Sequence, residues 1–139
     1  MGTGEVRHTD GDRSEIRIGQ HVLVTDQPLD AGGSDAGPSP TELFIASLAA
    51  CAEFYIQRFL RRHVGSLDGL TVRASAQMSS ERPARLTRVD IAVELPHGTP
   101  PELRNGALRA ADRCVVRESL RHPPEVELMV LPERVTSGR

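Results

Sequence analysis

Two cysteines, Cys51 and Cys114, are the side chains in this sequence whose type and placement could do chemistry. Each falls in an apolar segment with helical spacing, and packed helices about 8 to 10 Å apart can bring facing side chains together. A thiolate is a nucleophile, and two neighbouring thiols can be oxidised to a disulfide. The competing interpretation is structural, because a free cysteine often packs as a small buried hydrophobe. The sequence leaves open whether the two Cα atoms come within the roughly 7 Å that a disulfide needs.

Other catalytic groups are absent or poorly placed. All 17 basic residues are arginines, which excludes a Schiff-base lysine, a P-loop lysine and a serine–lysine dyad. The five histidines have no cysteine or acid at ligand spacing, so no metal is expected. Ser47 lacks the glycine-flanked turn of a hydrolase nucleophile, and the GGSDAG stretch has no following lysine to make a phosphate cradle. The thiols remain the strongest candidates.

Length and charge narrow the class of protein further. The 139 residues fit a single domain, residues 1–139. A chain this short has a large surface for its volume, so its stability is modest without a partner. The formal net charge of -2 provides no basic field for DNA or RNA, so nucleic acid is not expected as a partner. No uninterrupted apolar run has the length of a membrane span, and no signal peptide is evident. These features predict a cytoplasmic protein without a membrane partner.

The N-terminal part predicts a hairpin, a long loop and a helix. Residues 14–18 and 21–25 alternate as strands around the turn Gly19-Gln20. Residues 26–39 are rich in Gly, Pro, Asp and Ser and form an ordered loop of a length that is often functional. Ser39 then begins a helix as its N-cap, with proline next and Glu42 completing a capping box. This helix is apolar on nearly all sides, carries Cys51 at its middle and ends near residues 64–65.

The rest of the chain predicts an α+β fold. Residues 70–78 and 89–95 alternate as two antiparallel strands. A second capping box at residues 99–102 opens a helix that carries Cys114 on an apolar seam and stops at Pro123-Pro124. Residues 126–130 alternate as a last strand. The expected architecture is an antiparallel sheet packed on two long buried helices.

The two cysteines and their surroundings resemble the OsmC/Ohr family. The resemblance rests on the run GGSDAGPSPTELFIASLAACA, on a second helical cysteine 63 residues later in AADRCVVRESL, and on the following PPEVELMV, and it extends over about residues 14–130. It implies an OsmC-like intertwined homodimer and a thiol peroxidase without a bound cofactor. Cys51 would attack an organic hydroperoxide and become a sulfenic acid, Cys114 would resolve it as a disulfide, and an external thiol reductant would reopen that bond.

A buried peroxidatic cysteine needs a neighbouring cation, because burial alone raises the pKa of a thiol. In the family an arginine held by a glutamate supplies it, and the glutamate usually precedes the cysteine by ten positions, where this chain has Thr41. Glu42 lies nine positions before Cys51, on the opposite side of the helix and ~13 Å along it. It is either the capping-box acid or an active-site acid that reaches a neighbouring subunit. Arg13 and Arg17 are the candidate cations, with surface solvation as the alternative for each.

Two functions therefore stay open. The first is a peroxidase that reduces organic hydroperoxides in oxidative stress defence, with Phe44, Leu48 and Phe54 favouring an organic over an inorganic peroxide. The second is a non-catalytic OsmC-like protein that binds a small apolar ligand and whose thiols are incidental. Both share the fold and the homodimer.

Overall fold

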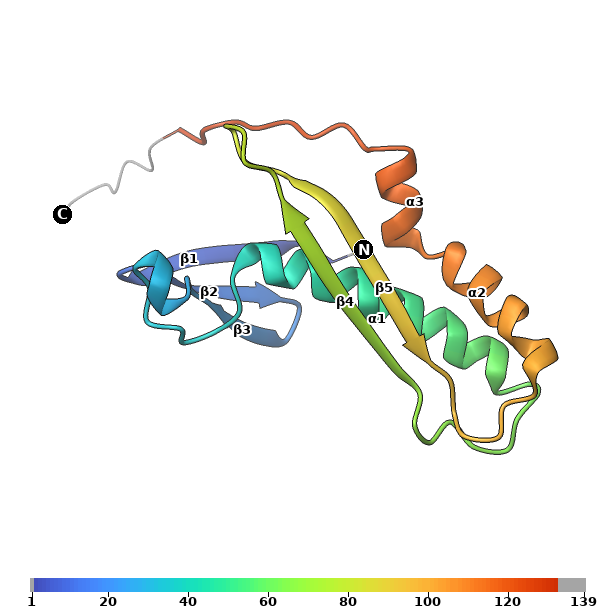
Figure 1. The fold of residues 1–139 in the computed structure, drawn as a ribbon. Coiled ribbons are helices and arrows are strands. Elements are labelled where there is room, and N and C mark those ends of the chain that lie inside the picture. The colour runs from blue at the N-terminus through green and yellow to red at the C-terminus, as the bar shows by residue number, and fades with distance from the viewer. Residues whose placement is uncertain (1, 133–139) are drawn as a thin grey trace.

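A computed structural model describes residues 2–132 and has the α+β architecture that the sequence predicts (Figure 1). Its strands are β1 (Gly4–Asp10), β2 (Arg13–Ile18), β3 (His21–Thr25), β4 (Thr71–Met78) and β5 (Leu86–Glu94). Its helices are α1 (Pro40–Leu60), α2 (Arg104–Asp112) and α3 (Val115–Arg121), with short 3-10 turns η1 (Leu29–Ala31) and η2 (Pro101–Leu103). Both sheets are antiparallel, with β1-β2-β3 in one and β4-β5 in the other.

The N-terminal sheet contains the predicted hairpin and one strand that the sequence did not predict. Ile18 pairs with His21 around Gly19, whose φ of 60 suits a tight turn. β1 joins as a third strand, and all of its residues are exposed. Because β1 has no buried face, it lacks the apolar alternation by which a strand is recognised. The sheet lies near the start of α1 (Figure 1).

α1 forms the core together with β4, β5 and α2. The predicted antiparallel pairing of β4 and β5 is confirmed, and Ala74 faces Ile91 across it. Ile56 and Leu60 of α1 and Ala107 of α2 are the buried centre. By length and composition α1 could also cross a membrane, with a mean hydropathy of 1.4, but the core helix of a folded chain meets the same test.

The second predicted helix is divided in two, and its predicted cap does not form. Cys114 has extended backbone (φ -59, ψ 129) between α2 and α3. Asp112 and the pair Val115-Val116 are weak helix formers, and Arg121 bonds Asp112 across the break. The Thr99 hydroxyl donates to the Pro96 carbonyl at 2.6 Å instead of capping a helix. The single long helix predicted here was therefore wrong.

The predicted last strand at residues 126–130 is also absent from the structure. This segment has irregular backbone, and Val126, Leu128 and Val130 are all exposed. A strand needs a hydrogen-bonded neighbour, and none of the strands within residues 2–132 pairs with this segment. The sequence of this segment alternates as a strand does, but the described part of the chain offers it no partner strand.

Candidate thiol site

The fold brings the two cysteines together from different elements. Cys51 lies at the middle of α1 and is half-buried, whereas Cys114 lies between α2 and α3 and is 1% exposed. Both are free thiols. The break after α2 turns the backbone at Cys114, so this residue reaches α1 although it is not on a continuous helical seam.

The pKa of Cys114 reports this proximity. Burial raises the pKa of the Cys114 thiol most strongly, and its hydrogen bond with the Cys51 thiol raises it further. The backbone N–H groups of Arg117 and Val116 act in the opposite direction. Cys114 is therefore a protonated thiol at neutral pH and lies close to Cys51. Two such thiols can be joined by a two-electron oxidation.

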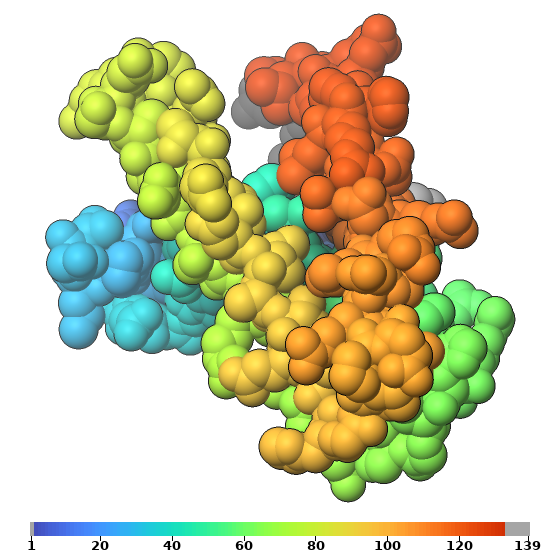
Figure 2. All heavy atoms as spheres, turned by 45° about the vertical axis from the view of Figure 1, so that its right-hand side comes forward, coloured from blue at the N-terminus to red at the C-terminus, as the bar shows by residue number. Residues whose placement is uncertain are grey.

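A pocket of about 330 Å³ opens beside Cys114, between α1, β5, α2 and α3. Figure 2 shows the hollow between β5 and the α2–α3 segment, with part of α1 at its base. Its lining is mostly apolar with charged groups at the edge: Leu48, Ala52, Ile91, Val93, Leu108, Arg109, Ala111, Asp112, Cys114 and Arg117. Such a pocket fits an apolar molecule with a polar end.

Arg109 and Arg117 are members of this lining that the sequence reasoning missed. Arg117 follows Cys114 by three residues and pairs with Asp112 at 3.1 Å. The salt bridges of Asp112 with Arg117 and Arg121 lower its pKa, and the hydrogen bond from Arg121 is the largest cause. The i, i+3 spacing from Cys114 was a usable signal for Arg117. Arg109 lies on α2, five residues before Cys114, and this spacing gave no comparable signal.

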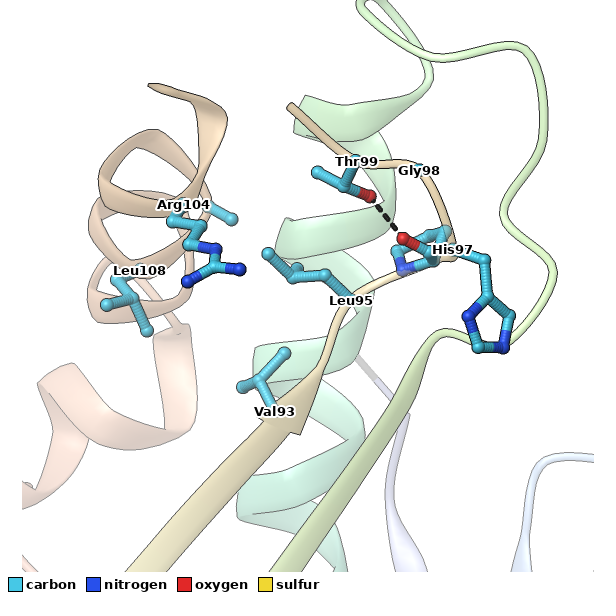
Figure 3. A pocket seen from close by; sticks show the side chains of 9 residues that line it. Val93, Leu95, His97, Gly98, Thr99, Arg104 and Leu108 are labelled. Carbon is cyan, nitrogen blue, oxygen red and sulfur yellow. Dashed lines mark hydrogen bonds between the residues drawn. The ribbon is translucent and has the colours of Figure 1, made fainter. Parts of the chain in front are cut away.

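A second pocket, of about 440 Å³, adjoins the first along β5 and holds neither thiol. Figure 3 shows Val93 and Leu95 on one side of it and Arg104 and Leu108 of α2 on the other. Val93 and Leu108 line both pockets, so the apolar surface between β5 and α2 is continuous.

Arg13 lies with two aspartates of the N-terminal region. Its Nε is 3.9 Å from the Asp10 carboxylate, and its charge helps to lower the pKa of Asp26. The Nε atom is buried and has no hydrogen-bond partner among the described residues, although the side chain as a whole is partly exposed. Within one chain Arg13 thus belongs to the β2 end and the loop after β3.

Asp26 organises that loop and was not predicted from the sequence. It is 2% exposed, and its carboxylate accepts the backbone N–H groups of Gln27, Ser34 and Ala36 at 2.7, 3.2 and 3.0 Å. The bond from Ala36 is the largest of the causes that lower the pKa of Asp26, while burial opposes them. An acid followed by a glycine-rich loop was the available signal, because backbone N–H groups of such loops often converge on one carboxylate.

Two glycines of the same loop have no room for a side chain. A Cβ on Gly33 would lie 2.0 Å from the Gln27 carbonyl oxygen, and one on Gly37 would lie 2.1 Å from the Val24 carbonyl oxygen. The loop then closes where the Thr25 hydroxyl donates to the Pro38 carbonyl at 2.8 Å. The GGSDAG stretch is therefore a compact turn that leads the chain into α1.

Arg17 and Glu42 have local partners. Arg17 is exposed and pairs with Glu15 at 2.8 Å. Glu42 accepts the Ser39 N–H at 3.2 Å, and the Ser39 hydroxyl accepts the Glu42 N–H at the same distance. This arrangement is the predicted capping box, which is confirmed. Within one chain, neither side chain takes part in the contact between Cys51 and Cys114.

The chain matches one protein family and several solved structures. The family model described as OsmC-like protein matches residues 32–129, whereas no curated protein matches. A Psychrobacter arcticus protein named for osmotic stress induction and a detoxification response is 26% identical, with a TM-score of 0.76 over 86% of this chain and 88% of that one. An organic hydroperoxide resistance protein OsmC from Legionella pneumophila is 18% identical, with a TM-score of 0.68 over 87% and 89%. An organic hydroperoxide resistance protein from Elizabethkingia anophelis is 20% identical, with a TM-score of 0.65 over 87% and 89%.

Proposed function

Because the chain belongs to the OsmC-like family, we propose that it is a thiol-dependent peroxidase that reduces organic hydroperoxides through Cys51 and Cys114. The observation that carries the proposal is the proximity of a half-buried thiol on α1 and a buried thiol from the α2–α3 junction. Two of the similar structures are named organic hydroperoxide resistance proteins, which agrees with this activity. We also propose a role in oxidative stress defence and a cytoplasmic location.

The reaction has three steps. The Cys51 thiolate attacks one oxygen of the substrate R–O–O–H, the O–O bond breaks, and R–O⁻ takes a proton and leaves as an alcohol while Cys51 becomes a sulfenic acid. The sulfur of Cys114 then attacks the sulfur of Cys51, and the sulfenic oxygen leaves as water with the Cys114 proton. An external thiol reductant, such as a dithiol, returns two electrons and reopens the disulfide.

The assignment of roles rests on exposure. Cys51 is the more accessible thiol, so a peroxide reaches it more readily than it reaches Cys114, which is 1% exposed. Cys114 is kept protonated and in contact with Cys51, as a resolving residue requires. Phe44 and Leu48 lie on α1 near the Cys51 turn and provide an apolar approach that favours an organic peroxide over hydrogen peroxide.

The proposal includes a homodimer. Within one chain Arg13 lies with Asp10 and Asp26, and Arg17 and Glu42 have local partners, so we propose that the cation beside Cys51 comes from a second subunit. The exposed apolar residues support a covered surface in the assembled protein, because Phe54 on α1 and Leu128 in the C-terminal segment face solvent in the single chain. In this arrangement the N-terminal sheet of one subunit, with Arg13, approaches Cys51 of the other.

The second candidate function is the binding of a small apolar ligand by a chain whose thiols are incidental. The pocket of about 330 Å³ favours it, because its lining is mostly apolar and has arginines at the edge. The absence of Arg13 and Glu42 from the thiol contact of their own chain also agrees with it.

Steady-state turnover of single-cysteine variants separates the two functions. With cumene hydroperoxide and a dithiol reductant, we expect Cys51→Ser to abolish turnover. Cys114→Ser should still consume one equivalent of peroxide and hold Cys51 as a sulfenic acid that a dimedone probe traps. Ser119→Ala, a substitution on exposed α3, serves as the control and should keep full activity. Wild-type protein that binds an apolar probe but turns over no peroxide would support the ligand-binding function instead.

A further inference from the structure

Four arginines line a groove between α1 and α2 that the proposed peroxidase chemistry does not use. We call it the arginine groove. It has a volume of about 450 Å³ and is lined by Tyr55, Arg58, Phe59, Arg62, Gly106, Arg109, Ala110 and Arg113. The four arginines are exposed, and the lining contains no carboxylate. The groove therefore combines an aromatic wall with four positive charges.

Close packing of the two helices concentrates these charges. A Cβ on Gly106 would lie 2.3 Å from the Phe59 ring, so only glycine lets α2 approach α1 this closely. Arg109 follows Gly106 by three residues on α2, and Arg113, the C-cap of α2, follows it by seven; both line the groove. Arg58 of α1 and Arg62, in the turn after α1, have the same four-residue spacing and line the groove from the other side.

The four charges are not neutralised by the rest of the described chain. Arg58 and Arg62, and likewise Arg109 and Arg113, lie four residues apart where a helix ends, so each pair brings two like charges to the groove. Within residues 2–132 none of the four arginines forms an ion pair. By contrast, every arginine within a β-strand forms one: Arg7, Arg13, Arg17, Arg73 and Arg88. The C-terminal ends of α1 and α2 supply only about half a negative charge each.

We propose that the arginine groove binds a multiply charged phosphate-bearing anion. Planar guanidinium groups match the geometry of phosphoryl oxygens and bind them with paired N–H donors. Several such groups around one groove favour a ligand with two or more phosphoryl groups over a single carboxylate. Tyr55 and Phe59 provide a surface on which an organic part of the ligand stacks. Neither Cys51 nor Cys114 belongs to the lining of the groove, although Arg109 lines both the groove and the pocket beside Cys114.

Calorimetric titration of the reduced full-length protein tests the proposal, with sodium triphosphate as the inorganic probe and ATP, which has the same number of phosphoryl groups, as the organic probe. We expect saturable binding at low ionic strength that weakens as salt is added. Arg62→Gln and Arg113→Gln should each weaken binding by about tenfold or more, the size of one lost charge-assisted hydrogen bond. Tighter binding of ATP identifies an organic ligand, and equal or tighter binding of triphosphate identifies the phosphoryl groups alone.

Two control variants distinguish the groove from other positive or reactive sites. Arg104→Gln removes an exposed arginine that also lies on α2 but outside the groove, so affinity should be unchanged. Cys51→Ser should also bind normally, which separates this site from the peroxidase function. Absence of saturable binding to both probes would overturn the proposal, as would an equal loss of affinity in Arg104→Gln. If neither probe binds and Arg62→Gln dissociates a dimer in sedimentation, the arginines belong to a subunit interface instead.

Discussion

At the residue scale, the chemistry of this chain depends on two thiols in unequal surroundings. Cys51 is half-buried on a helix that opens towards solvent, while Cys114 is enclosed and has a raised pKa. A protonated, enclosed thiol is a poor first nucleophile but a suitable second one, because it needs only to reach a neighbouring sulfenic acid. The difference in environment, more than the presence of two cysteines, supports a division of roles.

The raised pKa of Cys114 predicts a pH dependence of stability. A thiol whose native pKa lies above its unfolded value holds its proton more strongly when folded, so its contribution is full below about pH 8.5 and is lost as the pH rises towards the native pKa. We expect the free energy of unfolding of the reduced wild-type protein to fall above about pH 8.5. The free energy of unfolding of Cys114→Ala should fall less over the same pH range. Urea unfolding of both proteins across this range measures it. Parallel curves for the two proteins would contradict the prediction.

At the element scale, the parts that the sequence predicts well are those fixed by neighbours in the chain. Ser39 and Glu42 correctly indicated the start of α1, and Gly19 indicated the hairpin between β2 and β3. The parts that it missed depend on residues distant in sequence. Asp26 collects N–H groups from a loop folded around it, and Cys114 sits at a break that is bridged by the side chains of α3 and Asp112. Hydrophobic period alone cannot reveal either arrangement.

The cap of α1 predicts a measurable loss of stability. Ser39→Ala removes the hydroxyl that accepts the Glu42 N–H, so the free energy of unfolding should fall by about 1 kcal/mol. Ser47→Ala is the matched control, because its exposed hydroxyl bonds only to the Phe44 carbonyl inside the same helix, and it should change stability by less than about 0.5 kcal/mol. Urea unfolding reports both values. Equal effects of the two substitutions would argue against a role for the cap.

At the scale of the whole molecule, the single chain leaves many apolar side chains in contact with solvent. Leu128 is 96% exposed in a segment that alternates as a strand does, and Phe54 is 46% exposed on the core helix. The short N-terminal sheet and the two-stranded β4–β5 sheet also have open edges. Each of these features is accounted for if a second copy covers it, which is why the homodimer is central to the proposed function.

Substitution in the C-terminal segment tests that dimer. Leu128→Asp places a charge where the dimer would bury an apolar side chain, so the dimer dissociation constant should rise by about tenfold or more. The neighbouring substitution Glu127→Gln removes a charge without adding one to an apolar surface and should leave the dimer intact. Sedimentation velocity measures both. A wild-type protein that sediments as a stable monomer would contradict the homodimer and the shared thiol site.

The most direct test of the thiol peroxidase account is one turnover of the fully reduced protein. Cumene hydroperoxide and hydrogen peroxide are added in equal amounts to separate samples of the protein. Mass spectrometry then counts the free thiols and identifies any disulfide. We predict that the organic peroxide rapidly converts two thiols per chain into a bond between Cys51 and Cys114, and that hydrogen peroxide does so more slowly. Thiols that survive an excess of both peroxides would contradict the account.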